Sequence, residues 1–270
     1  MSEWTDKPVR FSIIDYLNAL PLNLAFKDGL YQDRVSLAFD YPSMCADNLA
    51  SNRADVGLIS SIEYQRIPNL KVAPGICIAS RNEVRSVLII TKCRLRDIKV
   101  MAVDRFSRSS TALLRLLLKR RYDVEPRFVS MTPDSESMLA NADAALIIGD
   151  AAFEVQSDAE YEVRDLAGLW FEETGLPFVF AFWAMRPGGP TQEICRILND
   201  ARAYGKRELM SRLPAIRERW LLSDAEIRKY FDVHIHYELG DEECESLRLF
   251  YAYASETNVI GQAFPIRWAV

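Results

Sequence analysis

Short apolar runs alternate with helix-like segments along the first half of the chain. The runs at 9–14, 35–39 and 55–59 lack helical spacing and are long enough for buried strands. The segment 43–52, which follows Pro42, has its apolar residues on one side and predicts a helix. Strands separated by helical patterns are typical of βαβ units, so this pattern predicts an α/β protein with largely parallel pairing.

A second cycle of the same alternation begins after the polar cluster at 81–85. The leucine-rich stretch 111–121 has leucines on more than one face, which predicts a helix packed on two sides. Beyond residue 185 the chain is helical in pattern as far as 257, without a convincing strand. The further predicted strands are 72–78 (interrupted by Pro74 and Gly75), 86–90, 98–103, 124–129, 142–148 and 178–185.

This restart predicts two lobes, one inserted into the other. Residues 1–85 and 185–270 would form the first lobe and residues 86–184 the second, with strands near residues 86 and 183 crossing between them. Two crossings would leave a cleft that closes by a hinge over a small ligand, as in type II periplasmic-binding folds. The alternative is a single doubly wound domain with a helical tail, but its one sheet would be unusually wide.

Composition restricts the class of protein further. Hydrophobic residues make up 49% of the 270 positions and charged residues 26%, an ordinary globular balance, and the net charge of −5 argues against nucleic-acid binding. We expect no membrane span and, since the first residues lack a signal-peptide core, a cytoplasmic protein. The cysteines are scattered and unpaired in pattern, which fits reduced thiols better than disulfides or a metal site; they are Cys45, Cys77, Cys93, Cys195 and Cys244.

Asn18 is the first candidate for chemistry. It follows the strand 9–14 and stands where a helix would begin, with Pro21 in the first turn. This places it at the carboxyl edge of a sheet, where open α/β folds bind ligands. Capping of the helix by the asparagine is the commoner role of such a residue, and spacing alone favours it.

The stretch 107–111, Ser-Arg-Ser-Ser-Thr, is the second candidate. Hydroxyls beside the free N–H groups of a helix start suit a carboxylate, and the stretch lacks the glycines and lysine of a phosphate loop. Ordinary helix capping explains these residues equally well. His234 and His236 have no partners at metal spacing, so no metal site is predicted. Further candidates at predicted strand ends or crossings are Ser60, Ser61, Ser86, Gly149 and Asp150, the last a possible general base or helix cap.

Four segments together resemble one known family. They are 15–22 (DYLNALPL), 55–59 (DVGLI), 144–150 (AALIIGD) and 174–180 (TGLPFVF), and the likeness runs in order from residue 9 to residue 185. The sequence is similar to the chorismate dehydratase family of the futalosine route to menaquinone. The resemblance implies a two-lobed periplasmic-binding fold used as a cytoplasmic enzyme without metal or organic cofactor, which converts chorismate to 3-[(1-carboxyvinyl)oxy]benzoate and water.

The resemblance also bears on the candidate residues. By resemblance Asn18 would be catalytic. The positions of the other candidates, together with the two carboxylates of chorismate, lead us to expect that Ser60, Ser61, Ser86, Ser109, Ser110, Thr111, Gly149 and Asp150 bind the dianionic substrate, with Arg81, Arg85 or Arg108 as possible partners of a carboxylate. Two alternatives stay open. One is the sister enzyme that cyclises dehypoxanthine futalosine, which carries a histidine where Gly149 stands here. The other is a non-catalytic small-anion-binding domain. The sequence is silent on the oligomeric state.

Overall fold

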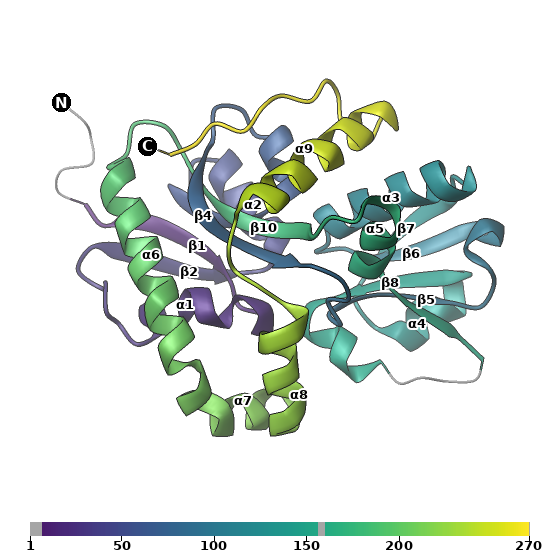
Figure 1. Ribbon diagram of the computed structural model, residues 1–270, viewed down its shortest axis with the longest axis horizontal. Coiled ribbons are helices and arrows are strands. Elements are labelled where there is room, and N and C mark those ends of the chain that lie inside the picture. The colour runs from purple at the N-terminus through teal and green to yellow at the C-terminus, as the bar shows by residue number, and fades with distance from the viewer. Residues whose placement is uncertain (1–6, 156–159, 270) are drawn as a thin grey trace.

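The computed structural model describes residues 7–155 and 160–269, which form two separate five-stranded sheets with helices packed on them (Figure 1). We call each sheet with its helices a lobe, and the predicted two-lobed α/β fold is confirmed. The first sheet, in the order β2-β1-β3-β10-β4, consists of β1 (Val9–Ile14), β2 (Val35–Asp40), β3 (Val56–Ser60), β4 (Lys71–Ser80) and β10 (Phe178–Met185). The second, in the order β7-β6-β8-β5-β9, consists of β5 (Val87–Thr91), β6 (Val100–Asp104), β7 (Arg127–Met131), β8 (Ala144–Ile148) and β9 (Glu162–Asp165).

Both sheets are mixed, and the antiparallel strands are those next to the crossings between lobes. β1 pairs in parallel with β2 and β3, and β6 pairs in parallel with β7 and β8. β10 runs antiparallel to β3 and β4, and β5 runs antiparallel to β8 and β9. The predicted parallel pairing therefore holds for the βαβ units, whereas a strand that enters from the other lobe runs the opposite way.

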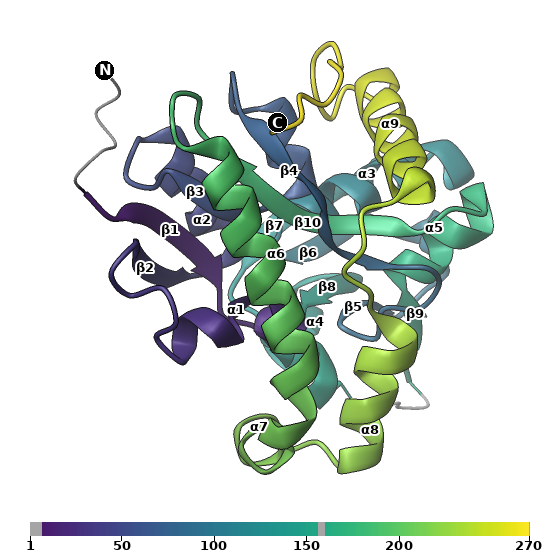
Figure 2. The same ribbon diagram turned by 60° about the vertical axis from the view of Figure 1, so that its left-hand side comes forward.

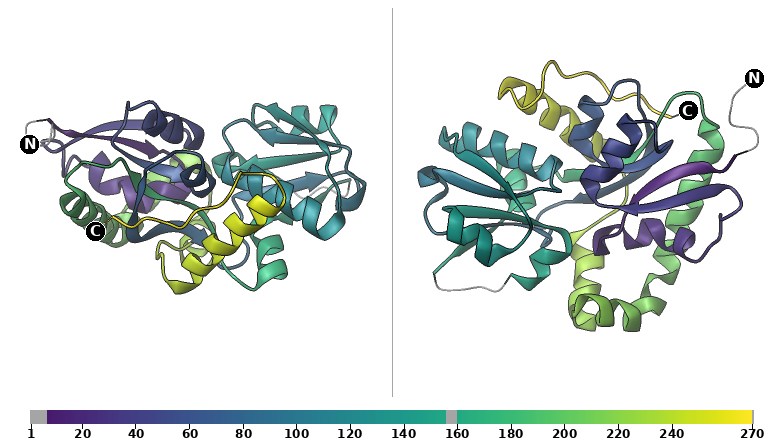
Figure 3. Two further views of the ribbon diagram at one scale, coloured as in Figure 1. Left: turned by 90° about the horizontal axis from the view of Figure 1, so that it is seen from above. Right: turned by 180° about the vertical axis from the view of Figure 1, so that it is seen from behind.

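The two crossings lie at 81–86, between β4 and β5, and at 175–177, just before β10. The first agrees with the crossing expected near residue 86. The second lies earlier than the expected crossing near residue 183, because all of β10 pairs within the first sheet. Residues 178–184, placed in the second lobe on sequence grounds, therefore belong to the sheet of the first. Figure 3 shows the two lobes side by side.

Helices cover the faces of both sheets. The long C-terminal part is helical as predicted, whereas α4, β9 and α5 were not predicted as separate elements. The helices of the first lobe are α1 (Leu20–Lys27), α2 (Pro42–Ala50), α6 (Thr191–Glu208), α7 (Leu213–Trp220), α8 (Asp224–Lys229) and α9 (Asp241–Glu256). Those of the second lobe are α3 (Ser109–Tyr122), α4 (Ser135–Asn141) and α5 (Leu166–Thr174).

The leucine-rich helix α3 packs on two sides, as predicted. Its leucines at 113, 114, 116, 117 and 118 are all buried. α3 contacts α5 of its own lobe and α9 of the other lobe, and Figure 2 shows both helices close to it. Because each buried leucine contributes about 1.5 to 3 kcal/mol of hydrophobic stabilisation, α3 is firmly held where the two lobes meet.

Two isolated bridges tie the C-terminal segment to the first sheet. His236 pairs with Ala79 and Trp268 pairs with Val72, both on β4. The segment that follows α8 therefore runs beside the strand that leads into the first crossing. This arrangement brings residues from the end of the chain close to the cleft.

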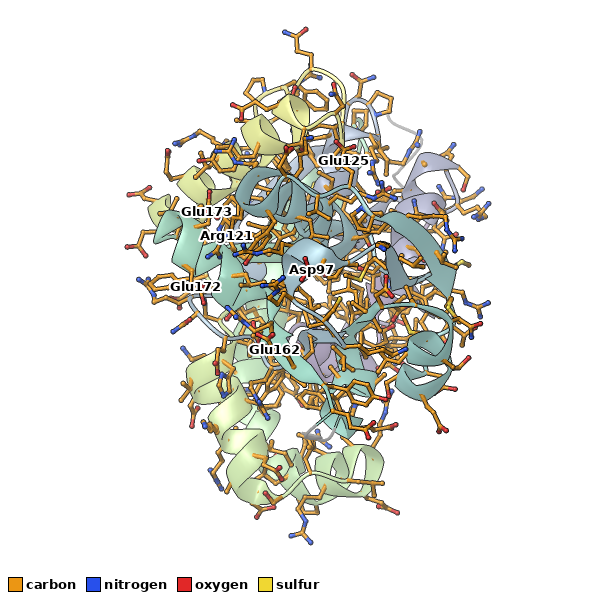
Figure 4. The ribbon with its side chains drawn as sticks, turned by 90° about the vertical axis from the view of Figure 1, so that its right-hand side faces the viewer. Asp97, Arg121, Glu125, Glu162, Glu172 and Glu173 are labelled. Atoms are coloured by element: carbon orange, nitrogen blue, oxygen red, sulfur yellow. The ribbon has the colours of Figure 1, made fainter. Side chains whose placement is uncertain are left out.

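Charged side chains of the second lobe form ion pairs on its outer face (Figure 4). Arg121 at the end of α3 lies 3.1 Å from Glu172 and 3.7 Å from Glu173 of α5. Exposed pairs of this kind contribute about 0 to 1 kcal/mol each, so this network adds little beyond the packing of α3 on α5. Across residues 7–155 and 160–269, none of the helices combines the length and the apolar character that a membrane crossing requires.

Candidate functional site

A cavity lies between the two lobes at the ends of several strands. Counted with its open mouth it measures about 500 Å³, of which only about 40 Å³ is open to the centre of a water-sized sphere. The first lobe contributes residues from the turn after β1, from the end of β3 and from β10, and the second lobe contributes the start of α3 and the end of β8. The cavity therefore lies where carboxyl ends of parallel strands meet, as open α/β folds predict.

Asn18 lines this cavity and does not cap a helix. After β1 the chain forms a short 3-10 turn, Leu17–Ala19, and α1 begins at Leu20 with Pro21 in its first turn. Neither this turn nor α1 has a side-chain cap. The Oδ1 atom of Asn18 is buried and has no hydrogen-bond partner. The capping interpretation is therefore wrong, and the Oδ1 atom is left without a partner.

The start of α3 forms the opposite wall of the cavity. Ser107, Arg108, Ser109 and Ser110 line it, and no side chain caps the helix. The first N–H groups of a helix have no acceptor within the helix, and they favour an anion. The Oγ of Ser107, a residue only 8% exposed, also lacks a partner. Simple capping is thus not the role of this stretch in the structure.

The second lobe adds Ser86 and Gly149, and the first adds Ser60. Ser86 is 2.9 Å from the hydroxyl of Tyr230, while its carbonyl accepts the N–H of Gly149 at 2.8 Å. Gly149 has a φ of +65°, in the left-handed region that favours glycine. Ser60 ends β3 and is buried. These candidates, together with Asn18, Ser109 and Ser110, are brought to one cavity by both lobes.

Three candidate residues do not line the cavity. The buried hydroxyl of Ser61 donates to the carbonyl of Val179 at 2.7 Å and lies 3.1 Å from that of Ser109, so it joins the lobes. Thr111 lines a different hollow on the far side of α3. Asp150 accepts the N–H of Leu17 at 2.9 Å. The structure offers a role for each of them outside the wall of the cavity.

Sequence reasoning did not select Tyr16, which also lines the cavity. A Cβ atom on Gly149 would lie 2.6 Å from the Tyr16 ring, so the ring occupies the space that the glycine leaves open. Burial raises the pKa of the Tyr16 phenol, and the nearby carboxyls of Asp104 and Asp150 raise it further. The phenol is therefore neutral at physiological pH. Its position two residues before Asn18, in the same turn, was the available signal.

Aromatic stacking also joins the lobes beside the cavity. The rings of Tyr41, from the first lobe, and Phe106, from the second, stack with centroids 4.0 Å apart and planes 11° from parallel. Tyr16 meets Tyr41 edge to face at 6.4 Å. Aromatic pairs of this geometry contribute about 0.5 to 1.5 kcal/mol beyond the area they bury, so they favour the closed arrangement.

Arg108 brings a positive charge to the cavity, whereas Arg81 and Arg85 are not among its lining residues. The Arg108 guanidinium lies 3.3 Å from Asp47 and 3.6 Å from Glu63, two carboxylates of the first lobe. These contacts hold the guanidinium in place near the start of α3. Arg108 therefore brings to this wall a guanidinium whose charge two carboxylates already partly balance.

A histidine base and a metal ligand set are both missing from the lining of the cavity. His234 contacts the carbonyl of Glu83 at 3.0 Å, and His236 lies 3.0 Å from Glu243. Within residues 7–155 and 160–269, no three His, Cys, Asp or Glu side chains are grouped as a metal site requires. Burial raises the pKa of Asp104 to about 6, although the N–H of Phe106 and the charge of Arg105 oppose the shift.

Comparison with known proteins assigns the chain to a family. A family model described as menaquinone biosynthesis matches residues 9–256. The chain belongs to this menaquinone biosynthesis family. The chain is 32% identical over 188 residues to a protein of Thermus thermophilus named chorismate dehydratase, covering 63% of this chain and 67% of that protein. It is 26% identical over 254 residues to a Campylobacter jejuni protein of the same name, covering 92% and 99%.

Solved structures share the fold of this family member at low sequence identity. A protein of Archaeoglobus fulgidus matches with a TM-score of 0.77 and 16% identity, over 94% of this chain and 98% of that one. The periplasmic aliphatic sulphonate binding protein of Escherichia coli matches with a TM-score of 0.66 and 17% identity, over 97% and 91%. At such identities the likeness concerns the fold alone, and it agrees with the two-lobed periplasmic-binding architecture.

Proposed function

We propose that this protein is a chorismate dehydratase, a hydro-lyase that converts chorismate to 3-[(1-carboxyvinyl)oxy]benzoate and water in the futalosine route to menaquinone. The observation that carries the proposal is that polar groups without hydrogen-bond partners belong to both walls of one cavity. Asn18, whose buried Oδ1 has no partner, lines it from the first lobe, and the uncapped start of α3 lines it from the second. The names of the relatives support the choice of substrate.

Chorismate carries two carboxylates, and the walls of the cavity match this charge. The N–H groups at the start of α3, the hydroxyls of Ser107 and Ser110 and the charge of Arg108 would hold one carboxylate. The carboxamide of Asn18 would orient the enolpyruvyl group from the other wall. The apolar side chains of Ile14, Phe180 and Val87 would enclose the ring.

The reaction removes the proton on C3 and the hydroxyl on C4, and the ring becomes aromatic. The C3 proton is acidified through the ring carboxylate, so a strong base is unnecessary. This agrees with a cavity that no histidine lines. The enolpyruvyl carboxylate, held by Asn18, would take the proton, and it leaves with the hydroxyl as water. The protein would then contribute orientation and stabilisation of developing charge.

The cyclising sister enzyme is the weaker candidate for this cavity. That family places a histidine where Gly149 stands, and here the ring of Tyr16 fills the space beside the glycine. A non-catalytic binding domain is the other candidate, since the fold is shared with a sulphonate binding protein. Turnover separates the three, because a binder would show a thermal shift without product and the sister enzyme would leave chorismate unchanged.

The test is incubation of the purified protein with chorismate, followed by chromatography of the aromatic product. We expect Asn18→Ala to lower kcat by about 100-fold or more, comparable to the loss of one donor that stabilises developing charge. The surface variant Asn199→Ala is the matched control, because its amide contacts only the carbonyl of Cys195 on its own helix. Near-normal turnover by Asn18→Ala would exclude the catalytic role of this residue, and no turnover by the parent protein would exclude the activity.

A further inference from the structure

The turn that carries Asn18 is held by two side chains that are remote in the sequence. Asp150 Oδ1 accepts the N–H of Leu17 at 2.9 Å, and the hydroxyl of Tyr237 donates to the carbonyl of Asn18 at 2.8 Å. The N–H of the residue before Asn18 and the carbonyl of Asn18 itself are thus both anchored. The direction of the carboxamide therefore depends on these two anchors.

The two anchors belong to different lobes. Tyr237 lies in the C-terminal segment, where its carbonyl accepts the N–H of Cys77 on β4, so it moves with the first lobe, as does Asn18. Asp150 follows β8 and belongs to the second lobe. The bond from Leu17 to Asp150 consequently exists only while the lobes are closed as they are here.

The surroundings of Asp150 leave it little freedom. Gly149 before it is held by the carbonyl of Ser86 and lies against the ring of Tyr16. Burial raises the pKa of the Asp150 carboxyl, while the N–H of Leu17, the side chain of Trp220 and the charge of Arg219 oppose the shift and the charge of Asp15 adds to it. The carboxyl thus faces groups of the first lobe, which donate to it or carry charge.

We propose that Asp150 is a positioning residue that couples closure of the lobes to the orientation of the Asn18 carboxamide, with Tyr237 as the permanent anchor on the other side of the same turn. The proposal rests on the proposed function, since it assigns Asn18 the role described above. It replaces direct substrate binding by Asp150 with an indirect role. In an open protein Asn18 would keep one anchor, and closure would supply the second.

Kinetics on chorismate test this coupling. We expect Asp150→Ala to lower kcat by about tenfold to 100-fold, as small misplacements of a reacting group do, with KM changed much less. Asp150→Asn retains an oxygen that accepts the N–H of Leu17 and should recover most of kcat. Tyr237→Phe, which removes only the hydroxyl that donates to the Asn18 carbonyl, should also lower kcat.

A matched control separates positioning from simple loss of a contact between lobes. Glu256 of α9 pairs with Arg120 of α3 at 2.6 Å, which also joins the lobes but lies away from Asn18. Glu256→Ala should leave kcat unchanged. If Asp150→Ala keeps the parent kcat, if KM rises as much as kcat falls, or if Glu256→Ala has the same effect as Asp150→Ala, the proposal is overturned.

Hydrogen exchange gives a readout that does not need turnover. The amide of Leu17 should be protected in the parent protein and in Asp150→Asn, and should exchange faster in Asp150→Ala, with thermal unfolding measured to confirm that each variant is folded. Equal exchange rates of the Leu17 amide in the parent and in Asp150→Ala would show that Asp150 does not anchor the turn. If the parent leaves chorismate unchanged, the proposed function fails, while the exchange data still decide whether Asp150 holds the turn.

Discussion

Two hollows border the start of α3, and they differ in how many of their polar groups already have hydrogen-bond or ion-pair partners. The cavity lined by Asn18 measures about 500 Å³ with its mouth, whereas the groove along the far side of α3 measures about 1820 Å³ on the same basis. We call the latter the basic groove, because five of its lining residues are cationic. These are Arg66, Arg108, Arg115, Lys119 and Arg120.

Most cations of the basic groove already have partners. Arg66 lies 2.6 Å from Glu63, and Lys119 lies 2.8 Å from both Asp123 and Glu125. Arg115 stacks over the ring of Phe128 at 3.8 Å. The larger and more charged hollow therefore offers a ligand little that its own side chains do not already supply.

The smaller cavity shows the opposite condition. The Oδ1 of Asn18, which lines this cavity and not the groove, and the Oγ of Ser107, which borders both hollows, are buried without partners, and the start of α3 is uncapped. A buried polar group left unsatisfied costs about 1 to 3 kcal/mol, which a ligand would recover. The difference teaches that unsatisfied buried groups indicate a binding site better than size or number of charges.

Among the changes that test this difference between the hollows, Gly149→Ala is expected to have the largest effect. The new Cβ would lie 2.6 Å from the ring of Tyr16, at a residue whose φ of +65° already disfavours a side chain. We expect turnover of chorismate to fall about 100-fold, because the ring would be displaced into the cavity, together with a loss of about 1 to 3 kcal/mol in the free energy of unfolding.

Gly75→Ala, in β4 and away from both crossings, is the control for that change. Its φ is +75°, but no atom lies within 4 Å of the added Cβ. It should therefore share the cost of backbone strain and leave turnover unchanged. Equal turnover for the two variants would show that the contact between Tyr16 and Gly149 does not shape the cavity.

The pH dependence of stability in Asp104 variants tests how much a buried polar group without a partner destabilises the protein. The residue is 1% exposed and its Oδ2 has no partner, and burial raises its pKa to about 6. Since this value lies above that of an unfolded chain, near 4, the folded state binds the proton more tightly, and stability falls as the pH rises through this window.

We expect Asp104→Asn to remove this penalty while keeping an oxygen for the N–H of Phe106, which Asp104 Oδ1 accepts at 2.8 Å. At pH 7.5 the variant should gain about 3 kcal/mol in the free energy of unfolding, at 1.36 kcal/mol per unit of pKa. The gain should shrink at pH 5 and disappear below pH 4. Chemical denaturation at the three pH values measures it, and a gain that is constant with pH would contradict the cause assigned here.

The smallest effect is expected in the basic groove. Arg115→Ala removes a cation that has an aromatic platform but lies outside the cavity. We expect a loss of less than about 1 kcal/mol in stability, the usual range for an exposed cation–π contact. The value of kcat/KM on chorismate should stay within about twofold, since no charged partner of the substrate is lost. A loss of tenfold or more would mean that the groove takes part in the reaction.

Much of the fold follows from local pattern, and the exceptions have physical causes. The runs that became β1, β3 and β8 are apolar enough to be recognised, and α3 carries its leucines on several faces. β9 was missed because three of its four residues in Glu162–Asp165 are charged and none of the four is fully buried. It pairs at the edge of the second sheet, so backbone hydrogen bonding to β5 places it there, without an apolar signal.

The candidate site divides in the same way. Asn18 and the stretch 107–110 could be found because polar residues at the end of a strand and at the start of a helix are local signals. The sequence could not predict that Ser61, Thr111 and Asp150 lie outside the cavity wall. The position of each side chain depends on a partner distant in the chain or on the direction in which a helix faces. Asp150 meets Leu17 across 133 positions.

The sequence by itself determined which segments become strands and helices and where polar groups interrupt them, since the spacing of apolar residues controls local structure. Only the tertiary structure decided which of those polar groups are left without a partner. That outcome depends on how the two lobes close on each other, and closure pairs residues such as Ser61 and Ser109 that no local pattern connects.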